Sequence, residues 1–225
     1  MTESNRFPFS WGRAILQVLL GLWMLAPSCG IAHAIAAEHA SAPVESHDHS
    51  NGIDGHYMES RDNKIAASEL LRETAWWRVA EKRGLDPYIL YAVALVESAK
   101  VSKRIAKPWS WALNRQGRPL APASQIDARG ILYDTLARGI RNIDVGLMQV
   151  NIRWQGHRVR QPEDLLDPET NLRVGADVLA EAIGSAPGDL ALGVGRYHAG
   201  SHDAARAYRY GRRVLAVARQ IRRLI

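Results

Sequence analysis

One carboxylate, Glu97, lies at a position where a buried helix face would normally carry an apolar residue. Leu90, Val93, Ala94 and Glu97 are spaced i, i+3, i+4 and i+7, so a helix brings them to one face. Burial beside the negative end of a helix would favour the protonated carboxyl, which is the form that a general acid needs. A glutamate that pairs with a neighbouring arginine at a helix end is the competing interpretation, and the helix alone favours it.

Two further segments change that balance. Residues 144–151 read DVGLMQVN and residues 195–200 read GRYHAG, while Val96–Ser98 reads VES. Together, in this order and at these separations, the three motifs resemble the SLT family of lytic transglycosylases, over about residues 70–215. Two segments are similar to the sequences of the specialised transglycosylases of conjugation, pilus and secretion systems: PWSWALN at 108–114 and NLRVGADVL at 171–179. The resemblance implies a mainly α, lysozyme-like (α+β) helical domain with one or two short β or irregular segments.

The resemblance also implies a role for each matching residue. Glu97 would be the catalytic acid and base, and Tyr197 would donate its hydroxyl to Glu97. Ser98 would hydrogen-bond near the substrate's N-acetyl group or orient the acid, and Met148 and Gln149 would line the glycan groove. The remaining residues that we expect to bind or orient the substrate are Asn151 and His198.

The chain departs from the family pattern at two places. The family usually has asparagine at the position of His198, so the role of this histidine is open. The stretch after Ser98 is Ala99-Lys100-Val101, where a Gly- or Asn-Pro-like sequence is usual, and this leaves the rim of the groove open.

A lone carboxyl is sufficient for the reaction that the family performs. Ordinary glycosidases need two carboxyls. In a lytic transglycosylase, one acid protonates the oxygen between MurNAc and GlcNAc, and its carboxylate then takes the proton of the C6 hydroxyl, which closes a 1,6-anhydro ring. Asp144 is the acid nearest to a motif, and we expect it to hold the turn that follows. If Asp144 instead activated water, the enzyme would be a muramidase, which is a hydrolase.

Other constellations give weaker signals. His198 and His202 have a spacing that can bind zinc, but Gly200 lies between them and no third ligand follows, so we expect no metal and no cofactor. Three tryptophans suit either sugar stacking or core packing: Trp109, Trp111 and Trp154.

The N-terminal part of the chain indicates export. Residues 1–36 combine two arginines, a short apolar run and Ala-x-Ala patterns, which predicts a secretory signal peptide and a periplasmic protein of the Gram-negative type. Cys29, the chain's single cysteine, lies inside this leader, and we leave open whether it is lipidated. Residues 37–64 are rich in Ser, His, Asp and Gly, which predicts a flexible linker. The resemblance implies that 65–225 form the SLT domain.

The pattern of the domain predicts helices with short irregular or β pieces between them. We expect helices at 66–83, which Gly84 would end, and at 87–98, 124–138, 168–182, 189–197 and 203–224. Residues 102–121 should be a loop with a short hairpin, and 142–154 a mixed segment.

The charge of the chain sets its range of partners. The formal net charge is +6, and residues 196–225 concentrate arginine. In an exported protein we expect these arginines to face solvent and to contact anionic peptidoglycan or a lipid surface, with no nucleic acid as partner. A non-catalytic scaffold of a secretion or conjugation apparatus is the rival from another class.

Overall fold

The computed structural model describes residues 73–102 and 105–224. The predicted leader (1–36) and linker (37–64) lie outside the described residues, as do Cys29 and the first part of the helix expected at 66–83.

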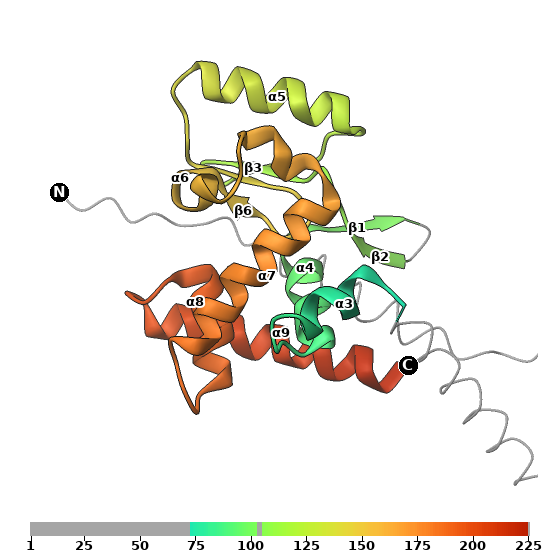
Figure 1. Cartoon of the computed structure of the whole chain (residues 1–225), viewed down its shortest axis with the longest axis vertical. Coiled ribbons are helices and arrows are strands. Elements are labelled where there is room, and N and C mark those ends of the chain that lie inside the picture. Colours follow the sequence, from blue (N-terminus) through green and yellow to red (C-terminus); the bar gives the residue numbers. More distant parts are fainter. Residues whose placement is uncertain (1–72, 103–104, 225) are drawn as a thin grey trace, which may run out of the picture.

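Helices make up most of the described chain, which confirms the mainly α fold (Figure 1). Among the described residues, no helix combines the length and the apolar character that a membrane span requires. The helices are α3 (Ala75–Glu81), α4 (Pro87–Ser98), α5 (Gln125–Ala137), α6 (Ile152–Gln155), α7 (Pro168–Gly184), α8 (Leu190–Ala199) and α9 (Ala204–Leu224), with 3-10 turns η1 (Gly156–Arg158) and η2 (Pro162–Leu166).

Polar side chains begin these helices at the positions that the sequence indicates. Asp86 accepts the N–H groups of Tyr88 and Ile89 at the start of α4, and Pro87 follows as the first helical residue. The same Asp-Pro pair begins α7, where Asp167 accepts the N–H of Thr170 at 2.8 Å. Other side-chain caps of this kind are Thr74 on α3, Ser124 on α5, Asn151 on α6 and Asp189 on α8.

The described chain contains more β structure than the sequence predicts. Strands β1 (Ala99–Ser102) and β2 (Ile105–Pro108) pair as one antiparallel sheet. The second sheet has the order β4-β3-β5-β6, built from β3 (Leu113–Arg115), β4 (Arg118–Leu120), β5 (Ile143–Val145) and β6 (Val150–Asn151). The single hairpin expected at 102–121 is therefore β3–β4, and β2 is an additional strand. Strands of two to four residues are too short for an alternating pattern to reveal.

The second sheet separates apolar from polar side chains. Leu113, Val145 and Val150 occupy one register row and are buried in the core. Asn114, Asp144 and Asn151 occupy the next row. Since neighbouring strand residues point to opposite faces, this second row forms a polar strip on the face away from those three side chains.

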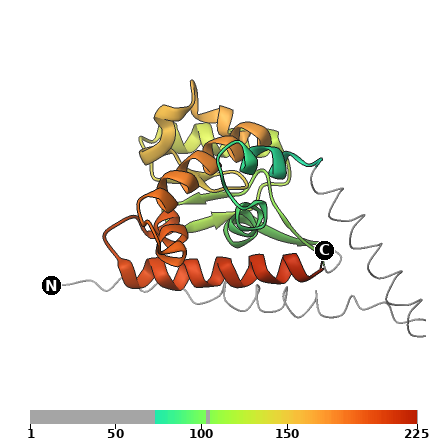
Figure 2. The ribbon, with the colours of Figure 1, turned by 60° about the horizontal axis from the view of Figure 1, so that its bottom comes forward.

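Helices α8 and α9 pack at unusually close range. A Cβ atom added at Gly195 on α8 would lie 1.9 Å from the carbonyl oxygen of Ala207, and one added at Gly211 on α9 would lie 1.9 Å from that of Ala191. These glycines therefore let the two backbones touch. Helix α9 runs along one side of the described molecule (Figure 2). Its buried residues include Tyr210, Val214, Val217 and Ala218.

Candidate active site

Glu97 lies in the last turn of α4, at the end of the apolar stripe formed by Leu90, Val93 and Ala94, which are fully buried. Its side chain is 14% exposed. The Tyr210 hydroxyl donates to Glu97 Oε1 at 2.6 Å, and the Nδ1 atom of His198 lies 3.6 Å from the same oxygen. No arginine or lysine among the described residues forms an ion pair with Glu97, so the helix-end ion pair, the competing interpretation of this residue, is absent there.

Tyr210 takes the position that the sequence assigned to Tyr197. The Tyr197 hydroxyl donates instead to the carbonyl oxygen of Met148 at 2.6 Å, and one hydroxyl proton cannot serve both acceptors. The prediction that Tyr197 holds Glu97 was therefore wrong about the donor. Burial raises the pKa of the Tyr197 phenol well above its usual range, and the charge of Glu97 adds to this, which places Tyr197 in the neighbourhood of the acid.

His198 forms the outer side of this cluster. Its ring stacks on Tyr210 with centroids 4.7 Å apart and planes at 1°. An Arg206 guanidinium nitrogen lies 3.1 Å from His198 Nε2. Because arginine can only donate, Nε2 accepts, and the remaining ring proton lies on Nδ1, the atom that faces Glu97. The departure from the family pattern at this position thus places a second donor beside the acid.

Asp144 brings a second carboxyl to the site. Burial raises the pKa of Asp144 to about 6, against the lowering effect of its hydrogen bond with Asn151. The charge of Glu97 raises it further and His198 lowers it, so all three groups lie within electrostatic range. Asn151, the neighbour of Asp144 on the polar strip, donates to Asp144 Oδ1 at 2.7 Å. In the structure the Asn151 side chain therefore holds the Asp144 carboxyl.

The GLMQ turn, residues 146–149, is held from several sides. Gln149 has a left-handed backbone (φ 49°), and its amide donates to the carbonyls of Ala112 (3.0 Å) and Gly146 (2.8 Å). The buried Asn171 amide of α7 accepts the N–H of Met148 and donates to the carbonyls of Val145 and Leu165. Gln149 is half-buried and therefore partly accessible, so a contact with a glycan remains an expectation.

Met148 does not have the role predicted for its side chain, and of the two roles predicted for Ser98 the contact with the substrate is contradicted. Met148 is fully buried and packs against Gly175 of α7, so its side chain belongs to the core rather than to a groove. An apolar side chain in a turn between two strands is most stable when it is buried there. Ser98 is also buried, and its hydroxyl contacts the carbonyls of Leu147 (2.7 Å) and Ala94 (3.0 Å). It joins the end of α4 to the GLMQ turn, and a substrate contact through this hydroxyl is inconsistent with its burial.

The tryptophans divide into two kinds. Trp109 and Trp111 are half-buried and pack edge to face with centroids 5.0 Å apart, while Trp109 Nε1 donates to the Pro122 carbonyl. Trp154 is 64% exposed, and the Arg153 guanidinium lies 4.9 Å from its ring centroid. Of the three, Trp154 has the ring most open to a sugar. Among the described residues, no group of three or more metal-ligating side chains is present.

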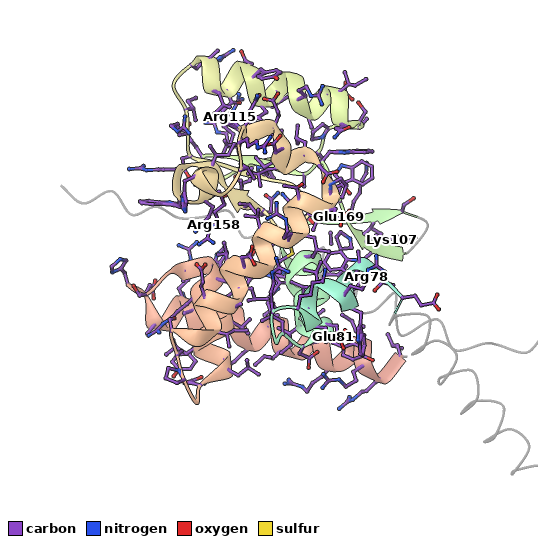
Figure 3. The ribbon with its side chains drawn as sticks, in the orientation of Figure 1. Arg78, Glu81, Lys107, Arg115, Arg158 and Glu169 are labelled. Atoms are coloured by element: carbon purple, nitrogen blue, oxygen red, sulfur yellow. The ribbon has the colours of Figure 1, made fainter. Side chains whose placement is uncertain are left out.

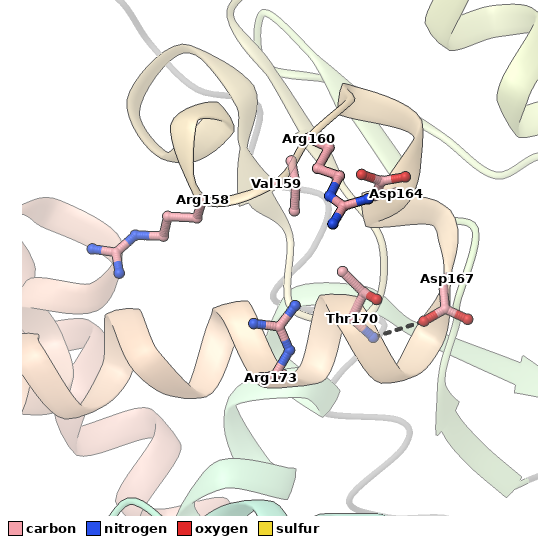
Figure 4. Close-up of a pocket in the computed structure, with 7 residues that line it drawn as sticks. All are labelled: Arg158, Val159, Arg160, Asp164, Asp167, Thr170 and Arg173. Carbon is pink, nitrogen blue, oxygen red and sulfur yellow. Dashed lines mark hydrogen bonds between the residues drawn. The ribbon is translucent and has the colours of Figure 1, made fainter.

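A cavity of about 350 Å³ lies elsewhere, between α7 and the segment that follows α6. Arg160 points into it from that segment and Arg173 from α7, whereas the side chain of Arg158, which also lines the cavity, extends away from the other lining residues (Figure 4). On α7, Arg173 is about 160° around the helix from Asn171, which holds the GLMQ turn, so the cavity opens on the other side of α7 from that turn. Arg158, labelled in Figure 3, already binds Glu181 through two hydrogen bonds. The cavity is therefore separate from the Glu97 cluster.

A family model described as "Transglycosylase SLT domain" matches residues 74–216. The chain belongs to this family. Its members are lytic transglycosylases that act on peptidoglycan, and their domain is lysozyme-like. A search of curated proteins and a search of solved structures each returned no match. The matched region contains the three motifs and Tyr210, so the described groups that contact Glu97, Tyr210 and His198, belong to the SLT domain.

Removing the hydroxyl of Tyr210 should lower the kcat of this SLT domain more than removing the hydroxyl of Tyr197. Hydrogen bonds to charged groups contribute about 1.5–3 kcal/mol, so Tyr210→Phe is expected to lower kcat on peptidoglycan about 10- to 100-fold. KM should change little, because the aromatic ring and its stacking on His198 remain. The measurement is steady-state release of soluble muropeptides by the purified variant.

Tyr197→Phe is the matched control, because its hydroxyl binds a neutral carbonyl rather than the acid. We expect a small loss of melting temperature and a smaller effect on kcat. A larger loss of kcat in Tyr197→Phe than in Tyr210→Phe would return the positioning role to Tyr197.

Proposed function

We propose that this SLT domain is an exported peptidoglycan lytic transglycosylase that cleaves the bond between MurNAc and GlcNAc and leaves 1,6-anhydroMurNAc. Glu97 is its single acid and base. The observation that carries the proposal is the environment of this carboxyl, which is 14% exposed, ends an apolar stripe and receives the Tyr210 hydroxyl at 2.6 Å.

The proposed reaction needs no water. Glu97 gives its proton to the glycosidic oxygen, the C1–O bond breaks, and positive charge develops at C1 of MurNAc. The substrate's own acetamido oxygen stabilises that charge. The Glu97 carboxylate then takes the proton from the C6 hydroxyl, and O6 bonds to C1, so the enzyme returns to its starting protonation state. While Glu97 is ionised, the Tyr210 hydroxyl and the Nδ1–H of His198 stabilise its charge.

Asp144 supports a second candidate function, that of a muramidase. Its carboxyl lies within electrostatic range of Glu97, and burial raises its pKa to about 6, which leaves most of the carboxyl ionised at neutral pH. A glycosidase that uses water needs such a second carboxylate. Asp144 is, however, already bonded to Asn151 at 2.7 Å, which favours the single-acid mechanism.

The product of digestion separates the two functions. We expect muropeptides that end in 1,6-anhydroMurNAc, each lighter by one water than the hydrolysis product. Mass spectrometry after complete digestion of purified peptidoglycan measures this directly. Reducing-end MurNAc as the main product would support the muramidase instead.

Asp144→Asn sharpens this test. The amide keeps the shape of the side chain and can still accept the hydrogen bond from Asn151. The pKa of Asp144 is raised in the folded chain, so its ionisation destabilises the fold as the pH rises through about 6, and the variant should remain folded at pH 7. We expect the anhydro product to persist, whereas loss of all cleavage with an intact fold would make Asp144 a second catalytic residue.

The proposal extends to the cellular setting. The signal-peptide pattern of residues 1–36 supports export to the periplasm, where peptidoglycan is accessible. The sequence of residues 108–114 and 171–179 supports an association with a conjugation, pilus or secretion apparatus. Local cleavage of the wall would then make room for the assembly.

A further inference from the structure

A row of arginines runs along the outer face of α9. Arg209, Arg212, Arg219 and Arg223 are all exposed. Their spacing of three, seven and four residues keeps them on one side of the helix, with exposed Ala216 in the gap. At 1.5 Å per residue the row is about 21 Å long. We call these four arginines the α9 stripe.

The α9 stripe points directly away from the core. At 100° per residue, its mean direction is about 180° from that of the buried residues Tyr210, Val214, Val217 and Ala218. Figure 2 shows α9 as a straight helix at one side of the described fold, with the other described elements beyond its inner face. The stripe is therefore the part of α9 that can meet a flat surface.

The charge of the stripe is largely uncompensated within the described residues. Residues 204–224 contain no Asp or Glu. Within the described ranges, no ion pair is formed by Arg209, Arg219 or Arg223, and the Arg212 guanidinium lies 5.6 Å from the ring centroid of Tyr208. Arg222, on another side of α9, shows the contrast, because it binds Asp86.

We propose that the α9 stripe docks this protein on an anionic membrane surface. The row is convex and straight, which suits a plane of phosphate groups better than a polymer chain that a groove would enclose. Between Arg212 and Arg219, the one described residue on the side of α9 that carries the stripe is Ala216, whose side chain is a single methyl group. The contact is therefore electrostatic and does not insert large apolar groups into the bilayer. Docked in this way, the Tyr210–Glu97 pair lies on the opposite side of α9 from the lipid, about one helix diameter of 10 Å away.

The test is the partitioning of the full chain onto vesicles. The vesicles contain phosphatidylethanolamine with a quarter of phosphatidylglycerol, and vesicles without the anionic lipid serve as reference. A basic residue near such a surface contributes about a fivefold change in partition coefficient at low ionic strength. We therefore expect anionic vesicles to bind the chain in a salt-sensitive manner, and binding to fall about fivefold for each arginine that is lost. The test variant carries Arg209→Gln, Arg212→Gln, Arg219→Gln and Arg223→Gln.

A second variant separates position from net charge. It removes the same number of exposed arginines from other parts of the fold, and so changes the net charge equally. Its substitutions are Arg118→Gln, Arg129→Gln, Arg160→Gln and Arg173→Gln. We expect this variant to bind nearly as well as the unaltered chain. Any contribution of residues 1–36 is the same in both variants, and the reference vesicles measure it.

Three outcomes would overturn the docking proposal. The two variants could lose binding equally, binding could be independent of anionic lipid and salt, or the stripe variant could lose binding to purified peptidoglycan alone, which would assign the stripe to the wall. Release of muropeptides from soluble glycan strands is measured in parallel. Since the stripe lies away from Glu97, this activity should be unchanged, so failure of docking and failure of the proposed enzymatic function are distinguishable.

Discussion

Glu97→Gln is expected to abolish measurable release of muropeptides from peptidoglycan. The amide keeps the shape of the side chain and can still accept the hydrogen bond of Tyr210, but it has no proton to give to the glycosidic oxygen. General acid catalysis contributes roughly 10²- to 10⁴-fold, and the same carboxyl serves both proton transfers in the proposed mechanism, so the loss should lie at or beyond the upper end of that range. Turnover of purified sacculi by the variant measures it.

The control for this variant is its melting temperature, because a buried change can act through the fold. Glu97 forms no ion pair with an arginine or lysine among the described residues, so we expect the variant to unfold within a few degrees of the unaltered chain. A variant that digests sacculi at the unaltered rate would make Glu97 structural. Absence of digestion by both the variant and the unaltered chain would instead favour the non-catalytic scaffold.

Gly195→Ala should cause the largest loss of stability. The added methyl group would lie 1.9 Å from the carbonyl oxygen of Ala207 and 2.3 Å from its carbonyl carbon. These are backbone atoms of α9, so no side-chain rotation can relieve the overlap and the two helices must separate. We expect a loss of about 3 kcal/mol or more, which lowers the melting temperature by about 10 °C. Thermal unfolding followed by circular dichroism measures the shift.

Gly130→Ala provides the matched comparison. This glycine lies within α5, and an added Cβ would have no neighbour within 4 Å. Alanine is the better helix former, so this variant should be more stable by about 0.5–1 kcal/mol. If both alanine variants changed stability in the same direction and to a similar extent, the close approach of α8 and α9 would not explain the need for glycine at position 195.

The helices were predictable because their first residues carry local signals. The pairs Asp86-Pro87 and Asp167-Pro168 combine an N-terminal cap with a residue whose backbone suits the first turn, and both begin helices in the structure. Gly84, expected to end a helix, has the positive φ of 63° that such an end requires. The short strands carry no such signal, because two to four residues are too few for an alternating pattern, and the β3–β5 pairing joins segments that α5 separates in the sequence.

The site was predicted in part. Glu97 could be found because a carboxylate interrupts an apolar stripe, which is a local pattern. Tyr210 was missed because no motif contains it, although it lies on the inward face of α9, where a tyrosine hydroxyl needs a partner. Tyr197 belongs to a motif, and the prediction gave it the role that Tyr210 has in the structure, which is to donate to Glu97. Sequence motifs identify residues that lie near the acid, but the choice of hydrogen-bond partner is decided by tertiary packing.

Glu97 and Asp144 are held by different elements, and this affects how the product of such enzymes could change in evolution. One acid stands on a helix and the other on a sheet, and the two supports are joined by side chains: Ser98 reaches the Leu147 carbonyl, and Asn171 ties the Met148 N–H to Val145. The separation of the acids therefore depends on two buried polar residues, Ser98 and Asn171. If Asp144 takes part in catalysis, substitutions at those residues would shift the balance between ring closure and attack by water while both carboxyl residues are retained, so activity within this architecture can diverge through changes in its interior.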